Sequence, residues 1–255
     1  MNVADAERYA IERAKWDAHA GDHDEPITIL PPGVDFTTQA PRDKLLPGIA
    51  EHLGDLRGRR IVEYGCGLGK MTVLLARSGA HVSAFDLSER SVEVARQRIR
   101  LHGLYDLVEF AVAPGEQLPF ADGAFDLAFG KAVLHHLDAT AGARELARIL
   151  KPGGRAAFSE PLGTNPVVTA ARAHLPYPGK HDRGADIPLR RQDIEAWTAP
   201  FEWTELRGVQ LFSMVERMLG FGRKVGPLRT VDRALLERWP GLWPLCRYGV
   251  LLIRR

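Results

Sequence analysis

Short apolar runs alternate with longer amphipathic stretches through the middle of the chain. Five of the runs have the length and composition of buried strands, at residues 61–64, 81–85, 108–112, 125–130 and 156–159. The segments between them repeat apolar residues with helical spacing. This alternation of strand and helix is typical of an α/β fold with a parallel, doubly wound sheet.

Local signals indicate where some of the helices begin and end. Ser88 precedes an apolar helical stripe that ends at Gly103, so we expect it to cap the helix between the second and third strands. The sequence KPGG at 151–154 is expected to stop a helix over 144–150, because proline cannot continue a helix and glycine accepts left-handed dihedrals. A strand is then predicted to restart at Arg155.

Two regions interrupt this rhythm within what we expect to be a single domain. Residues 1–58 begin with a helix-like segment and continue into a proline-rich stretch, which we interpret as a helical lid or cap. Residues 59–160 form the expected core. Residues 161–200 are an insertion after the fifth strand, and long irregular segments of this kind are often lids or binding loops. Residues 201–255 contain strand-like stretches that complete the same domain.

The composition limits the classes of protein to consider. A chain of 255 residues with 45% hydrophobic residues is large enough for one sizeable α/β core. It carries 34 basic and 32 acidic side chains, a net charge of +2, which is too balanced for a protein whose affinity depends on neutralising nucleic-acid phosphates. No apolar run approaches the ~20 residues that span a bilayer. We therefore expect neither a nucleic-acid nor a membrane partner.

The N-terminus and the two cysteines bear on the compartment. The first ten residues, MNVADAERYA, mix acids with bases and lack the apolar run of a secretory signal, so a cytoplasmic location is expected. Cys66 lies inside a glycine-rich turn, where a disulfide would obstruct the close approach of a ligand to the backbone. Cys66 and Cys246 are therefore interpreted as free thiols.

The strongest chemical signal is a glycine-rich turn between the first strand and the helix that follows it. In IVEYGCGLGK the glycines Gly65, Gly67 and Gly69 let backbone N–H groups approach a ligand at a helix N-terminus. A dinucleotide fingerprint would place its third glycine one residue later, at Lys70. Moreover Glu63 would repel a pyrophosphate, so a cationic ligand suits the turn better.

An acidic residue at the end of the second strand adds a second feature of the ligand. Asp86 follows Gly65 at close to the ~20-residue spacing at which a carboxylate takes ribose hydroxyls. The ligand is therefore expected to carry both a ribose and a positive charge.

Four motifs in order now resemble one superfamily over nearly the whole chain. They are E-x-G-x-G-x-G at 63–69, FDLS at 85–88, FDLAFGKAVLHHL at 125–137 and LKPGGRAAFSEP at 150–161. Together they resemble the class I S-adenosylmethionine-dependent methyltransferases. The resemblance implies S-adenosyl-L-methionine as the cofactor and a Rossmann-like sheet of seven strands, the last antiparallel, closed by the N-terminal helix and the 161–188 segment.

The same resemblance implies roles for particular residues around the cofactor. The methionine part would be lined by Glu63, Gly65, Cys66, Gly67 and Gly69, the ribose would be bound by Asp86, and the adenine would be flanked by Leu87 and met at its edge by Gly115, Glu116 and Gln117. Lys131 would stand beside the cofactor, with no role assigned. Tyr9 and Trp16 resemble the aromatic face of a covering helix, where a sulfonium would find a cation–π partner; core packing of the two rings is an equal alternative.

Candidate catalytic residues lie at the carboxyl ends of the fourth and fifth strands. His135 and His136 follow the fourth strand and Glu160 ends the fifth, on the edge where α/β enzymes carry out their chemistry. Glu160 is the preferred candidate to remove a proton or stabilise positive charge. The alternatives are that the histidines support the cofactor loop and that Glu160 is solvated or paired with an arginine.

The acceptor pocket is expected to be shaped by the segment after the fifth strand. It carries a basic cluster, from which His174, His181 and Arg183 are the candidate substrate-binding residues. No set of metal ligands is apparent. Displacement at a sulfonium methyl requires alignment and exclusion of water more than an elaborate catalytic group.

The methyl acceptor is expected to be a small molecule, such as a specialised metabolite methylated at oxygen, nitrogen or carbon. No DPPY or NPPY tetrapeptide follows the fourth strand, which argues against methylation of DNA bases or protein glutamine. Three alternatives stay open: a methyltransferase that acts on a peptide or other macromolecule, a non-catalytic cofactor-binding module, and a nucleotide-dependent oxidoreductase. Both a monomer and a homo-oligomer are compatible with the sequence.

Overall fold

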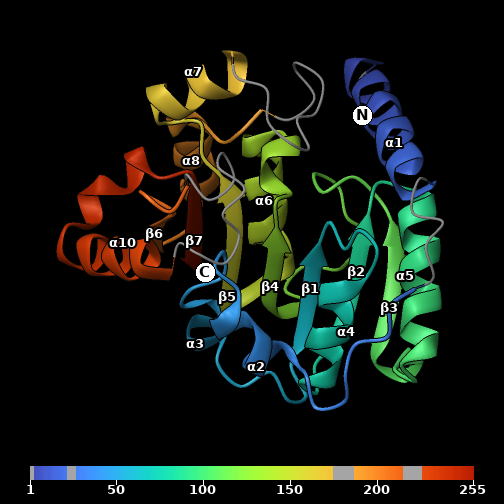
Figure 1. The fold of residues 1–255 in the computed structure, drawn as a ribbon. Helices are drawn as coiled ribbons and strands as arrows, with labels where there is room; N and C mark the ends of the chain where they lie inside the picture. Colours follow the sequence, from blue (N-terminus) through green and yellow to red (C-terminus); the bar gives the residue numbers. More distant parts are fainter. Residues whose placement is uncertain (1–2, 22–26, 175–186, 215–225) are drawn as a thin grey trace.

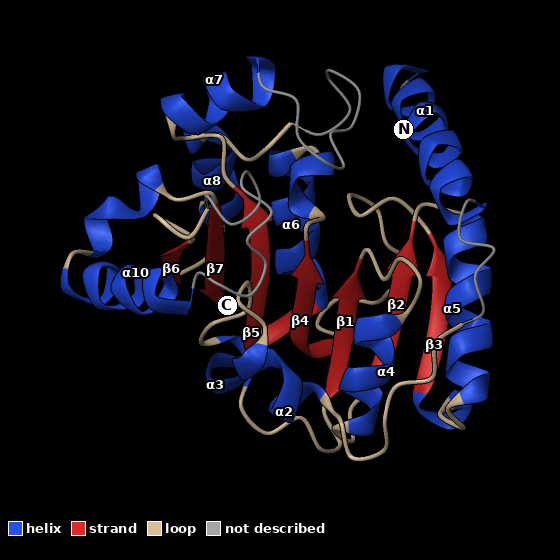
Figure 2. Ribbon diagram, in the orientation of Figure 1, coloured by secondary structure: helices blue, strands red, loops and turns tan. Residues whose placement is uncertain are grey.

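The protein is built around one seven-stranded sheet with helices on both faces (Figures 1 and 2). The computed structural model describes residues 3–21, 27–174, 187–214 and 226–255. The sheet has the order β3-β2-β1-β4-β5-β7-β6. Its strands are β1 Arg60–Tyr64, β2 His81–Asp86, β3 Val108–Val112, β4 Phe125–Lys131, β5 Leu150–Pro161, β6 Trp203–Val209 and β7 Tyr248–Arg254.

The strand directions confirm the predicted topology. The first five strands pair in parallel, whereas β7 pairs antiparallel with both β5 and β6. The order of the strands reverses between β1 and β4, so the loops at their carboxyl ends diverge and leave a crevice there.

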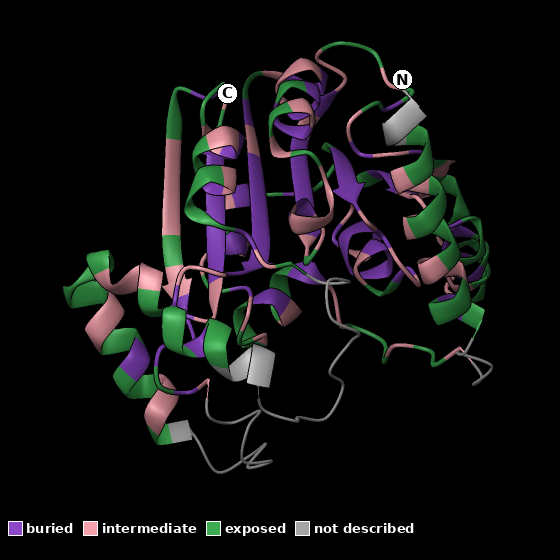
Figure 3. Ribbon diagram, turned by 90° about the horizontal axis from the view of Figure 1, so that it is seen from above, coloured by how far each residue is buried: buried purple, intermediate pink, exposed green. Residues whose placement is uncertain are grey.

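The helices form a layer on each face of the sheet, and the central strands lie buried between them, whereas the edge strands β3 and β6 are partly exposed (Figure 3). One face is covered by α2 Phe36–Gln39, α3 Ile49–Leu53, α4 Lys70–Arg77 and α5 Glu89–Leu101, and the other by α6 Ala139–Ile149 and α8 Arg191–Thr198. The remaining elements are α1 Val3–Gly21, α7 Pro166–His174, α10 Gly226–Arg238 and the 3₁₀ turns η1 Ala40–Arg42, η2 Tyr105–Leu107, η3 Leu134–His136 and η4 Pro240–Leu245.

Side-chain caps begin α5 and α6, two of the helices that lead away from the sheet. The Ser88 hydroxyl accepts the backbone N–H of Ser91 at 2.9 Å, which confirms the predicted start of α5. Asp138 caps α6 in the same way, through the N–H of Ala141 at 2.8 Å. Each cap stands after the carboxyl end of a strand.

The KPGG sequence occurs inside a strand, so the predicted break was misplaced. The helix expected over 144–150 is the second half of α6, and β5 already begins at Leu150. Leu150 pairs with Phe125, and the pairing resumes only at Arg155 opposite Leu127. The proline and glycines therefore form an irregularity within β5, because the neighbouring strand continues to supply hydrogen-bond partners beyond it.

Only the first part of residues 1–58 covers the sheet edge as a lid would. In the second part Phe36, Ile49 and Leu53 are at most 1% exposed and belong to the core on the α4 side of the sheet. The sequence pattern did not predict this core role, because the apolar residues of this proline-rich segment lie in short turns rather than in one periodic helix. The expected insertion is likewise partly core: Trp197 on α8 is fully buried against α6.

Three further observations concern the described residues. Cys66 and Cys246 are buried free thiols, as predicted. Among the described helices, none is both long and apolar enough to cross a bilayer. In the same part of the chain no group of three or more potential metal ligands was found.

Candidate active site

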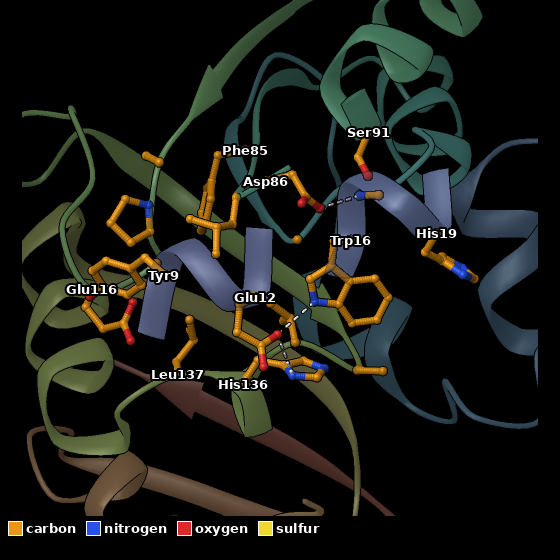
Figure 4. A pocket seen from close by; sticks show the side chains of 18 of the residues that line it. Tyr9, Glu12, Trp16, His19, Phe85, Asp86, Ser91, Glu116, His136 and Leu137 are labelled. Carbon is orange, nitrogen blue, oxygen red and sulfur yellow. Dashed lines mark hydrogen bonds and ion pairs between the residues drawn. The ribbon is translucent and has the colours of Figure 1, made fainter. Parts of the chain in front are cut away.

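A cavity of about 290 Å³ opens at the carboxyl ends of β1, β2 and β4, beneath α1 (Figure 4). It lies at the crevice where the strand order reverses, as expected for a ligand site in a doubly wound sheet. The residues that sequence reasoning selected and that line this cavity are Tyr9, Trp16, Gly65, Gly67, Asp86, Leu87, Gly115, Glu116, Lys131 and His136. The fold therefore brings most of the predicted cofactor residues together.

The glycine loop needs its glycines for two different reasons. A Cβ on Gly65 would lie 2.7 Å from Val133 Cγ2, and one on Gly69 would lie 2.8 Å from the Cβ of Ala95, so these two glycines permit close packing. A Cβ on Gly67, which has a φ of +48°, would meet no described atom within 4 Å. Its backbone thus faces the cavity, where a ligand can approach it closely.

Asp86 is held in place at the end of β2. One carboxylate oxygen accepts the N–H of Gly67 at 2.9 Å and the other accepts the N–H of Ser88 at 3.0 Å. Burial raises the pKa of Asp86, and these backbone donors oppose the rise because they favour the charged form. The carboxylate lines the cavity with lone pairs left for ligand hydroxyls.

Glu116 presents an acceptor atom that no described residue uses. Its Oε1 receives Arg8 Nη2 at 2.7 Å and the N–H of Asp138 at 2.9 Å. Its Oε2 is buried and has no hydrogen-bond partner among the described residues. A buried acceptor without a donor costs free energy. A ligand amino group, such as that of adenine, would supply the missing donor, so this end of the cavity fits the expected cofactor.

Glu63 does not line the cavity, contrary to the role that the resemblance implied. It points from β1 under the glycine loop, where it accepts the hydroxyl of Thr72 at 2.6 Å. Burial raises the pKa of Glu63 to about 8, and the nearby charge of Asp86 adds to the rise. Side chains alternate along a strand, and this register directs Glu63 toward α4 rather than toward a ligand.

Three more residues of the predicted cofactor set lie outside the lining. The Cys66 thiol is buried, and burial raises its pKa well above the usual value. Gly69 is the N-cap of α4, and Gln117 donates its backbone N–H to Pro114 O at 3.1 Å within the turn after β3. All three support the loops of the site rather than its surface.

Glu160 and His135 form a buried pair behind the cavity. Glu160 Oε2 lies 2.8 Å from His135 Nδ1, and Oε1 accepts the N–H groups of Val133 and Leu134 at 2.9 and 3.0 Å. Neither side chain lines the cavity. The expectation that Glu160 faces the acceptor is therefore not supported, because the turn after β4 passes between the carboxylate and the cavity.

His136 is the candidate base that does reach the cavity. Its Nδ1 lies 3.7 Å from Glu12 Oε2 on α1 (Figure 4). The same Glu12 oxygen accepts Trp16 Nε1 at 3.0 Å, and the Trp16 ring meets the His136 ring edge-on at 5.3 Å between centroids. Trp16 thus belongs to the cavity wall rather than to the core.

Helix α1 is attached over the cavity by charged side chains that sequence reasoning missed. Arg8 bonds Glu116 and also His136 O at 3.2 Å. Asp17 accepts the hydroxyl of Ser88 at 2.5 Å and the N–H of Arg90 at 3.2 Å. The spacing of Arg8, Glu12 and Trp16 on one face of a helix is a signal that could have indicated this contact.

Lys131 lines the cavity at the end of β4 and is paired with a residue of the N-terminal segment. Its Nζ lies 2.6 Å from Asp43 Oδ2. Asp43 was not selected from the sequence. Of the predicted substrate residues, His174 ends α7 with a side chain that is not described, and His181 and Arg183 lie outside the described residues.

Comparison with known proteins agrees with this geometry. Residues 62–158 match the family described as "Methyltransferase domain". Methyltransferase GfsG of Streptomyces halstedii is 38% identical over 120 residues, 46% of this chain and 43% of that protein. A ubiquinone biosynthesis O-methyltransferase of Bordetella avium is 38% identical over 125 residues, 48% and 50% of the two chains. The chain spans about half the length of the curated relatives it matches.

A solved structure extends the likeness of fold over the whole chain. The geranyl diphosphate C-methyltransferase of Streptomyces coelicolor, in complex with geranyl diphosphate and S-adenosyl-L-homocysteine, has a TM-score of 0.62 and 17% identity, and covers 97% of each chain. At this identity the likeness concerns the fold. Residues 62–158 thus match a methyltransferase domain, and the motifs and the sheet order agree with those expected of a class I S-adenosylmethionine-dependent methyltransferase.

Proposed function

We propose that the protein transfers a methyl group from S-adenosyl-L-methionine to a small-molecule acceptor. One observation carries the proposal: Asp86, Glu116 and the open backbone of Gly67 all line one cavity. A carboxylate for ribose hydroxyls, an acceptor for the adenine amino group and an unhindered loop match the parts of this cofactor. The alternative dinucleotide has a pyrophosphate, which the Asp86 carboxylate beside the loop disfavours.

The chain's own residues position the reactants and exclude water. When bound, the cofactor supplies a methyl group on a sulfonium; the acceptor atom forms the new bond to carbon while sulfur keeps the electron pair of the broken bond. Helix α1, with Tyr9 and Trp16, covers the cavity and can shield the reaction. Of the three candidate bases only His136 lines the cavity, and we assign it to accept the acceptor's proton.

A small acceptor suits the way in which the cavity is enclosed. The α1 side chains lie across it and are bonded to Glu116, Ser88 and His136, so a folded macromolecule would have to displace this helix. Relatives whose names refer to small-molecule biosynthesis support the same choice. A peptide or another macromolecule as acceptor is the alternative. The cytoplasmic location and a monomeric or homo-oligomeric state stay predictions.

Ligand binding and methyl transfer can be tested separately. Calorimetry should show binding of S-adenosylhomocysteine and no binding of NAD. The protein is then incubated with methyl-labelled cofactor and a cell extract divided into small-molecule and macromolecular fractions. We expect label in the small-molecule fraction. Label in the macromolecular fraction would favour the alternative acceptor, and binding without any transfer would identify a non-catalytic module.

A further inference from the structure

Lys131 is a charged side chain of the cavity that has no role in the proposed methyl transfer. We propose that Lys131, held in place by Asp43, binds the α-carboxylate at the methionine end of the cofactor. The inference rests on the proposed function, because it assumes that this cofactor occupies the cavity. In this arrangement Asp43, in the N-terminal core segment, positions the Lys131 ammonium and does not itself contact the ligand.

The strand order determines which end of the cofactor reaches Lys131. Neighbouring strands are ~4.8 Å apart, so the ends of β2 and β4, which flank β1, are separated by about 10 Å. With ribose at Asp86 on β2 and adenine toward Glu116 beyond β3, the rest of the molecule extends over the glycine loop of β1. Its amino-acid end then arrives at the end of β4, where Lys131 stands.

Charge selects the group that Lys131 would bind. The described cavity wall carries two side chains of fixed positive charge, Arg8 and Lys131. Arg8 is bonded to Glu116 at the opposite end. The sulfonium and the ammonium group of the cofactor would both be repelled by Lys131. The α-carboxylate is the anionic group of the cofactor, so it is the part that gains from a cation at this place.

The ion pair with Asp43 leaves Lys131 able to bind a ligand. An ammonium group has three donors, and Asp43 Oδ2 takes one of them at 2.6 Å. Asp43 Oδ1 accepts the N–H of Leu45 at 2.9 Å, so the backbone holds the carboxylate in position. Asp43 is not among the residues that line the cavity, whereas Lys131 is. A ligand in the cavity therefore meets the ammonium group and not the carboxylate behind it.

Two ligands that differ in the amino-acid part provide the test. S-Adenosylhomocysteine carries the α-carboxylate, and 5′-methylthioadenosine keeps the adenosine and the thioether but lacks the amino acid. Measured by calorimetry, Lys131→Met should lower the affinity for S-adenosylhomocysteine about tenfold to a hundredfold, the range for a charge-assisted hydrogen bond. Its affinity for 5′-methylthioadenosine should stay unchanged. Lys131→Arg, which keeps the cation, should recover most of the difference.

A second ion pair, between Lys151 on β5 and Asp126 on β4, supplies a matched control. Lys151 Nζ lies 2.7 Å from Asp126 Oδ1 at the opposite end of β4. Lys151→Met removes a cation and an ion pair of the same kind far from the cavity, so both affinities should remain at the wild-type level. Asp43→Asn keeps the Lys131 ammonium but loosens its position, so we expect a loss of S-adenosylhomocysteine affinity that is clearly smaller than the loss in Lys131→Met.

The possible failures are distinguishable. If Lys131→Met lowers the affinity for both ligands equally, or for neither, Lys131 does not bind the carboxylate and the inference is wrong. The same holds if Asp43→Asn reproduces the full Lys131→Met loss, because the pair would then act only as a structural link. If neither ligand binds the wild-type protein, the proposed function itself fails.

Discussion

Glu160 Oε2 and His135 Nδ1 lie 2.8 Å apart, with at most 2% of either side chain exposed. The pair stands directly behind His136, whose ring centroid is 4.0 Å from that of His135. Because Glu160 also accepts two backbone N–H groups of the turn after β4, it fixes the segment that carries His136 into the cavity. We therefore expect Glu160 to act as a positioning residue rather than as a catalytic one.

Glu160→Gln should destabilise the fold as well as slow methyl transfer. The amide keeps one acceptor oxygen where the carboxylate has two, so a buried donor loses its partner at a cost of about 2–4 kcal/mol in the free energy of unfolding. Urea denaturation measures the loss. Glu202→Gln, at an exposed position, is the control. Unchanged stability with strongly reduced turnover would return Glu160 to a direct catalytic role.

Gly67→Ala should weaken cofactor binding beyond its cost to stability. Gly67 and Gly103 both have positive φ and open space where a Cβ would stand, but only Gly67 lines the cavity. Each alanine substitution should cost about 1 kcal/mol of folding free energy, because L-residues disfavour this backbone region. Calorimetry should show weaker S-adenosylhomocysteine binding for Gly67→Ala alone. Equal binding by the two variants would place the ligand away from the loop.

Asp86→Ala should weaken the binding of S-adenosylhomocysteine by about 1.5–3 kcal/mol of free energy, the contribution of hydrogen bonds to a charged group. The carboxylate also orients Gly67 through its N–H, which adds to the expected loss. Asp106→Ala, at an exposed position after α5, is the control and should bind as the wild type does. A folded Asp86→Ala protein with the wild-type dissociation constant would remove Asp86 from the ribose site.

Glu63 should make stability depend on pH between about 4.5 and 8. Its pKa is raised to about 8 in the folded protein, mainly by burial, against an ordinary value of 4.5 in the unfolded chain. The folded state therefore holds a proton that the unfolded state has lost, and the stability from this group falls as pH rises through that window. Glu63→Gln, which stays neutral, should lack this fall. Denaturant titrations at pH 5 and 8.5 measure the difference, and parallel curves would contradict the assignment.

Helix α1 should become protected when the cofactor binds. Its contacts with the body of the protein include the Arg8–Glu116 ion pair and the Asp17–Ser88 hydrogen bond, both at the rim of the cavity. S-Adenosylhomocysteine should slow hydrogen exchange of the α1 amides, and Asp17→Asn should reduce that effect. Glu7→Gln, on an exposed position of the same helix, is the control. High protection with and without ligand would make α1 an ordinary part of the core.

The sequence by itself determined the parallel part of the sheet and the ligand-site residues that directly follow its strands. Strand and helix patterns are local, so they predicted the parallel strands and the cap at Ser88. The glycine loop and Asp86 each follow a strand directly, and parallel strands bring their carboxyl ends to one edge of the sheet. The sheet topology therefore places the residues of these separate motifs around one cavity.

Only the tertiary structure decided which distant side chains meet around that cavity. Asp43 and Lys131 are 88 positions apart, and Glu160 reaches His135 across 25. Glu63 and Glu160 both looked like ligand-facing carboxylates in sequence, yet strand register turned one beneath the glycine loop and packing placed the other behind η3. Such pairings depend on how the core positions whole elements against one another. The local spacing of apolar residues does not indicate how far apart two elements lie in the fold or in which direction their side chains point.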